Sequence, residues 1–94
     1  MDGKAILMST KVRYICQSYN WKKNRRGKSL PELEVVKMIE AKSQSEAIRR
    51  AEKIHEIGNV AGVDAYMVEV DEEAGDYGEP EFFTRLGEVP NFED

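Results

Sequence analysis

The chain has 94 residues, of which 40% are hydrophobic and 34% charged, and its formal net charge at pH 7 is −4. This length allows one domain with a thin core, and the composition is typical of a folded chain rather than a disordered one. The single cysteine, Cys16, excludes an intramolecular disulfide and a zinc site built on several cysteines. The apolar stretch at residues 5–8 is too short for a signal peptide or a membrane span, so we expect a cytoplasmic protein.

Two strands are expected before residue 42. Residues 11–19, KVRYICQSY, alternate like a strand and carry β-forming residues on both faces. Residues 33–41, LEVVKMIEA, predict a second strand antiparallel to the first, because β-branched residues disfavour a helix here. The intervening residues 20–31 contain Asn24, Gly27 and Pro31 and predict a loop or a long hairpin turn.

A capping box begins the one predicted helix. Ser43 can accept a hydrogen bond from the amide of Glu46, whose carboxylate can reach back to the amide of Ser43. The helix should end near residue 57, because Gly58 suits a left-handed C-terminal position. Its apolar face is expected to consist of Ala47, Ile48, Ala51, Ile54 and Ile57. We expect this face to contact strand residues such as Val35 or Val36, Ile15, and Val68 or Met67.

Residues 63–70 and 81–86 predict two further strands, separated by an acidic turn region at 71–80. Phe82 and Phe83 should point to opposite faces of the last strand, which we expect at an edge of the sheet. The order β-β-α-β-β indicates an α+β fold with two layers, in which one helix lies on one face of a mostly antiparallel sheet. We expect a single domain over residues 1–94, with loose ends at 1–10 and 88–94, and a homodimer sharing an apolar face would suit this size.

Charge is segregated along the chain. Residues 1–30 carry eight basic side chains and one acidic side chain, whereas residues 31–94 carry six basic and seventeen acidic side chains. The basic residues concentrate at 22–28, where they could bind phosphates while Tyr19 and Trp21 stack on bases. The alternative is a solvated hairpin loop whose charges partly balance the acidic loops. The candidate nucleic-acid residues are Tyr19, Trp21, Lys22, Lys23, Arg25, Arg26 and Lys28.

The acidic end offers a second candidate surface, for a basic protein partner. Its spacing does not follow a calcium-binding loop, and the alternative is a turn and tail that only increase solubility. The candidate residues for a protein partner are Asp71, Glu72, Glu73, Asp76 and Glu79.

No residue pattern indicates catalysis. His55 is expected in the last helical turn, where it can favour the helix C-terminus by charge, and no acid, serine or cysteine is paired with it in a recognised motif. Cys16, in the middle of a strand beside Ile15, is expected to be a buried, inert thiol. We therefore expect no catalytic residue, no metal site and no cofactor.

The stretch AKSQSEAIRRAEKI followed by GVDAYMVEVDEEAGDYGEPEFFTRLGEVP resembles a group of small uncharacterised proteins of proteobacteria and their phages. The resemblance covers most of residues 12–90, including the Gln17-Ser18-Tyr19 strand, the basic loop and the Gly75-Asp76-Tyr77 segment. This group implies no activity. The order of elements also resembles small mobile-element proteins, among them some anti-CRISPR inhibitors, but this likeness transfers no functional residue.

Two functions follow as expectations. The first is a non-catalytic protein that binds a macromolecular protein partner, in its sharpest form a phage or mobile-element inhibitor of a bacterial defence complex. The alternative is a nucleic-acid-binding accessory protein that uses the basic loop at residues 22–28. A membrane partner is not expected.

Overall fold

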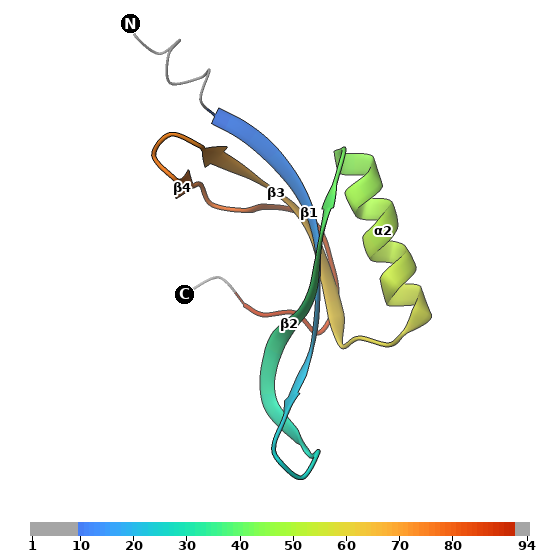
Figure 1. Cartoon of the computed structure of the whole chain (residues 1–94). Helices are drawn as coiled ribbons and strands as arrows, with labels where there is room; N and C mark the ends of the chain where they lie inside the picture. Colours follow the sequence, from blue (N-terminus) through green and yellow to red (C-terminus); the bar gives the residue numbers. More distant parts are fainter. Residues whose placement is uncertain (1–9, 92–94) are drawn as a thin grey trace, which may run out of the picture.

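The computed structural model describes residues 10–91 and shows one helix against a curled, mostly antiparallel sheet (Figure 1). The elements are β1 (Thr10–Lys23), β2 (Ser29–Ala41), α2 (Gln44–Ile57), β3 (Gly62–Asp71), β4 (Asp76–Tyr77) and β5 (Glu81–Gly87). The expected α+β class is therefore confirmed, with the short strand β4 added inside the predicted acidic turn. The expectations for residues 1–9 and 92–94 lie outside the described residues.

The sheet has the order β2-β1-β3, and β4 and β5 both pair with the far side of β3. All of these pairings are antiparallel. The predicted pairing of the first two strands is confirmed, although both are longer than expected and the turn between them is confined to residues 24–28. The pairing of β1 with β3 ends at Tyr19 and Gly62, so within residues 10–91 the hairpin beyond this point has no third strand beside it.

The helix begins and ends where local chemistry predicts. Ser43 is the N-cap, and its Oγ accepts a hydrogen bond from the amide of Glu46 at 3.2 Å. The carboxylate of Glu46 accepts from the amide of Lys42 rather than from that of Ser43, so the reciprocal half of the capping box differs from the expectation. Gly58 ends the helix in the left-handed region with φ of 83°, where a glycine has no Cβ penalty.

The helix packs through small side chains on one face of the sheet. Ala47 and Ala51 are fully buried there, which lets the helix backbone approach the strands closely. The buried cluster consists of Cys16, Ala41, Ala47, Ala51, Val63 and Ala65, and the half-buried Tyr14, Ile39, Ile48, Ile54, Phe83 and Leu86 pack against it.

Several expected contacts of the helix are wrong. Ile57 is 60% exposed, and Val35 and Val36 are exposed on β2. Ile15 and Val68 belong to a second cluster with Val70, against which Tyr66 packs. Because neighbouring residues of a strand point to opposite faces, Ile15 and Val68 lie on the face away from the helix, whereas Cys16 and Ala65 lie beneath it. We call this second side the helix-free face.

Candidate functional site

The hairpin of β1 and β2 extends beyond the body of the protein as a two-stranded arm, which we define as residues 20–34. Among the residues that the structure describes, its strands pair only with each other, through Asn20 with Glu34, Trp21 with Leu33, and Lys23 with Ser29. In Figure 1 the arm leaves the sheet at the end opposite to the β3–β4 turn. This arrangement exposes the residues at the tip of the arm to solvent on several sides.

Asn24 and Gly27 shape the turn at the tip. The side-chain Oδ1 of Asn24 accepts hydrogen bonds from the amides of Arg26 and Lys28, at 2.9 and 3.0 Å. The amide of Gly27 donates to the carbonyl of Asn24 at 3.0 Å, and its φ of 81° favours glycine. The hydrogen bonds that stabilise the turn are therefore made by the Asn24 side chain and by backbone groups. Among the described residues, the basic side chains of the turn contribute none of them.

The tip brings together the five basic residues predicted to bind phosphates. Lys22 Nζ lies 3.0 Å from Glu32 Oε2, and this hydrogen-bonded contact raises the pKa of Lys22. Within residues 10–91 the other four basic side chains form no ion pair, and all of them are exposed. These four, which we call the tip cations, are Lys23, Arg25, Arg26 and Lys28.

The two aromatic candidates near the arm differ in their accessibility. Tyr19 is not presented to solvent on the arm, because its side chain is only 1% exposed and its hydroxyl donates to Asp64 at 2.9 Å. Trp21 is half-buried and lies opposite Leu33 in the arm. Of the two, Trp21 has the larger surface exposed to solvent.

The acidic candidates lie at the other end of β3. Two of them are already engaged: Asp71 Oδ1 accepts from the amide of Glu73 at 3.1 Å, and Glu72 forms an ion pair with Lys11 at 3.6 Å. Glu73, Asp76 and Glu79 are exposed. Because β1 starts beside Asp71 and ends in the arm, the strand separates the acidic turn from the tip cations. The acidic residues of this turn therefore do not neutralise the tip cations through direct ion pairs.

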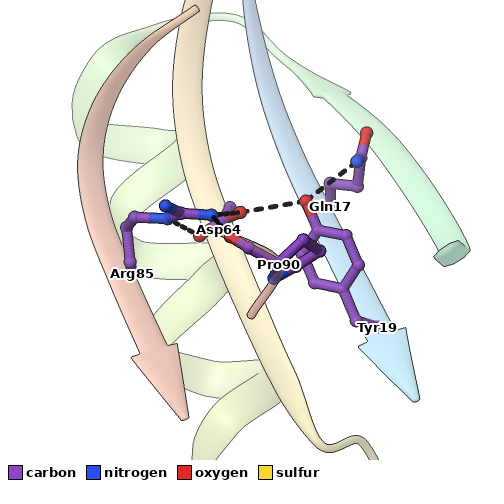
Figure 2. A network of polar contacts seen from close by, with 5 residues as sticks. All are labelled: Gln17, Tyr19, Asp64, Arg85 and Pro90. Carbon is purple, nitrogen blue, oxygen red and sulfur yellow. Dashed lines mark hydrogen bonds and ion pairs between the residues drawn. The ribbon is translucent and has the colours of Figure 1, made fainter. Parts of the chain in front are cut away.

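A polar network crosses the helix-free face beneath the C-terminal segment (Figure 2). Tyr66 donates to Gln17 Oε1, Gln17 Nε2 donates to the hydroxyl of Tyr19, and that hydroxyl donates to Asp64 Oδ2, each at 2.9 Å. Arg85 completes the network with two contacts to Asp64 and one, at 2.6 Å, to the carbonyl of Pro90. Every fully buried side-chain N or O atom in the described part of the chain has a partner.

The surroundings of the two tyrosines in the network disfavour their ionised forms. Burial, together with the hydrogen bond to Asp64 and the charge of that carboxylate, raises the pKa of Tyr19 well above its ordinary value. Burial and the charge of Asp64 also raise the pKa of Tyr66. Sequence reasoning missed this network; the signals available were an acid at Asp64 between the apolar residues Val63 and Ala65 and a lone cation at Arg85 in the last strand.

Next to the network, the helix-free face is hollowed into a pocket of about 390 Å³. We call it the helix-free pocket. Its walls come from β1, β2, β3 and the β4–β5 segment, and they are mainly apolar and aromatic. The lining residues are Ile15, Gln17, Tyr19, Met38, Tyr66, Val68, Tyr77, Pro80 and Phe82.

The residues considered for chemistry take structural positions. Cys16 is buried beneath the helix, and burial raises the pKa of its thiol, as expected for an inert cysteine. His55 lies in the last turn of α2, as predicted. Among the described residues no three His, Cys, Asp or Glu side chains are grouped to hold a metal ion. No helix in residues 10–91 is long and apolar enough to cross a bilayer.

Comparisons with protein-family models, with curated proteins and with solved structures gave no match.

Proposed function

We propose that this protein is a non-catalytic nucleic-acid-binding protein that contacts phosphates with the tip of its hairpin arm. The observation that supports the proposal is the set of four tip cations, which are exposed and without an ion pair in the described part of the chain. A cluster of this kind is unfavourable by itself, because like charges held close together repel one another. Phosphate groups would relieve that repulsion and release counterions.

The acidic net charge of the chain does not oppose this proposal. The longest dimension of the structure is 56 Å, and the acidic turn and the tip lie toward opposite ends. At physiological salt the Debye length is about 8 Å, so the field of the acidic turn is largely screened at the tip. Residues 20–34 carry five basic and two acidic side chains, so the arm itself is positive.

The protein-partner hypothesis has less support. Of the acidic residues expected to meet a basic partner, Asp71 accepts hydrogen bonds within its own turn and Glu72 is paired with Lys11. The exposed acids that remain are Glu73, Asp76 and Glu79. Inhibition of a bacterial defence complex stays a prediction, to be tested by affinity capture from a host lysate with and without nuclease.

The proposal is tested by fluorescence anisotropy with labelled 12-nucleotide single strands and a 12-base-pair duplex at about 50 mM salt. Four phosphate contacts predict a slope of log K against log salt near −2.8 for single strands and near −3.6 for duplex DNA. The arm variant, in which the four tip cations are changed to Gln, should lose binding.

A matched control changes four exposed cations outside the arm, Lys37, Lys42, Arg49 and Lys53, to Gln. This control alters the net charge equally and should retain the affinity of the natural protein. An absence of binding at high micromolar protein overturns the proposal, as does an equal loss of affinity in the two variants.

A further inference from the structure

A role for the helix-free pocket in nucleic-acid binding would extend the proposed function and rests on it. We infer that the nucleic acid is single-stranded and that one unpaired base enters this pocket while the tip cations hold the phosphates of the same strand. The inference is carried by three features: the chemistry of the pocket walls, the hydrogen-bonding groups on its floor, and its connection to the arm on one face of the sheet.

The walls offer flat apolar surfaces to a planar ligand. The rings of Tyr66 and Phe82 lie 5.5 Å apart between centroids at an interplanar angle of 55°. Tyr77, from β4, is 67% exposed, and Met38, from β2, is 59% exposed. The volume is at the small end of ligand pockets, which span about 300–1,000 Å³. Aromatic walls favour bases because every base has a π-face that can stack.

The floor has spare, uncharged hydrogen-bonding capacity. The amide nitrogen of Gln17 carries two hydrogens, and one of them is used by Tyr19. The oxygen of the same amide accepts one hydrogen bond, from Tyr66, and retains a second lone pair. A donor and an acceptor that lie side by side on one carboxamide match the edge of a nucleobase. A charged ligand would find no counter-charge among the side chains that line the pocket.

An apolar strip connects the pocket to the arm. The register of β2 changes between Ser18 and Tyr19, so Val35 lies opposite Tyr19 and Leu33 lies opposite Trp21. Because facing residues of an antiparallel pair share a face, Met38, Val35 and Leu33 follow one another along the helix-free side of β2. In Figure 1 the arm and β4 both curve to the side of the sheet away from α2. A single strand could therefore contact the tip and the pocket at the same time.

The charges near the pocket indicate where the bound part of the nucleic-acid strand ends. Asp76 and Glu79 are exposed close in sequence to Tyr77 and Pro80, so phosphates beyond the pocket would meet like charge. The strand is expected to run from the tip cations along the apolar strip and to finish with the inserted base. A duplex cannot satisfy this geometry without opening, because its bases are stacked and paired within the helix.

The test uses single-stranded 12-mers that contain one 2-aminopurine, a fluorescent base whose emission changes when it stacks. Tyr77→Ala removes the most exposed pocket wall, and Ile57→Ala, 60% exposed on α2, is the matched control. We expect Tyr77→Ala to weaken single-strand binding about fivefold or more, since stacking contributes roughly 1–3 kcal/mol per base. Tyr77→Phe should retain the affinity, and Ile57→Ala should not change it.

Two further readouts separate stacking from charge. The salt slope should stay the same in Tyr77→Ala, because no phosphate contact is removed, whereas the arm variant lowers it. Binding of the duplex should be weaker than binding of the single strand by about the factor that Tyr77→Ala loses, since a closed duplex keeps the phosphate contacts but offers no unpaired base to the pocket. The change in 2-aminopurine emission on binding should be lost in Tyr77→Ala.

The outcomes distinguish this inference from the proposed function. If the arm variant loses binding but Tyr77→Ala binds single strands as the natural protein does, the inference is overturned and phosphate binding by the arm stands. Equal binding of duplex and single strand, with no change of 2-aminopurine emission, also overturns it. If the natural protein binds neither probe, both proposals are overturned.

Discussion

Asp64 and Arg85 form a two-point ion pair across neighbouring strands, with Arg85 Nε 2.8 Å from Asp64 Oδ1 and Arg85 Nη2 3.0 Å from Asp64 Oδ2. The Asp64 side chain is fully buried, whereas that of Arg85 is 29% exposed. The guanidinium also lies over the ring of Phe82, 4.1 Å from its centroid. One arginine thus neutralises the buried carboxylate, packs against an aromatic ring beside the pocket and holds the C-terminal segment through Pro90.

Removing this arginine should destabilise the protein strongly. Arg85→Met leaves Asp64 buried without its cation and should lower the free energy of unfolding by about 3–5 kcal/mol, measured by urea denaturation. Arg50→Met is the control, because its ion pair with Glu46 is exposed and should contribute only about 0.3–0.5 kcal/mol. Adding Asp64→Asn to Arg85→Met should recover part of the loss. Equal costs for the two arginine variants would contradict the role of this pair.

Stability should fall at alkaline pH. The folded state raises the pKa values of Tyr19, Tyr66 and Cys16 above their ordinary values, so the folded chain keeps protons that the unfolded chain releases. Their contribution is complete below the unfolded pKa values, near 9 for the thiol and 10 for the tyrosines, and is lost as pH rises above them. The free energy of unfolding should therefore decrease above about pH 9, and Tyr19→Phe should make that decrease shallower. An unchanged slope in Tyr19→Phe would show that its ionisation is not coupled to folding.

Gly62 should not tolerate a side chain. A Cβ at this position would overlap the backbone of Glu88, whose amide donates to the carbonyl of Ala61 at 2.9 Å. Gly62→Ala should therefore displace residues 88–90 and cost about 1–3 kcal/mol or more, as overpacking does. Gly78→Ala is the control, since its Cβ would lie at an ordinary 3.5 Å from the nearest atom. Similar denaturation midpoints for the two variants would contradict the close approach at Gly62.

Two isoleucines of α2 provide a test of the helix face. Ile54 packs against the buried cluster, whereas Ile57, one turn later, is 60% exposed. Ile54→Ala should lower the free energy of unfolding by about 2 kcal/mol, the low end for isoleucine truncation because the side chain is half-buried. Ile57→Ala should change it by less than about 0.5 kcal/mol. A reversed order would mean that the helix is rotated about its axis.

Local chemistry determined the elements that the sequence predicts correctly. The bounds of α2 follow from Ser43 and Gly58, whose capping roles involve atoms within a few residues. The same holds for the tip of the arm, where Asn24 and Gly27 form a turn that needs no tertiary contact. The basic cluster at 22–28 could be identified from the sequence, because its residues are consecutive in a predicted turn and their exposure does not depend on tertiary contacts.

Only the tertiary structure decided which face of each strand meets the helix. Strand β1 carries Ile15 beside Cys16, and β3 carries Val63, Ala65 and Val68, so both faces of each strand contain apolar residues and alternation alone cannot assign the core. The helix packs on the face that carries the smaller residues, such as Cys16 and Ala65. Ile15 and Val68 therefore lie on the helix-free face. The same choice placed Tyr19 over Asp64, because the pairing of these two side chains depends on the register between β1 and β3 and not on their neighbours in the sequence.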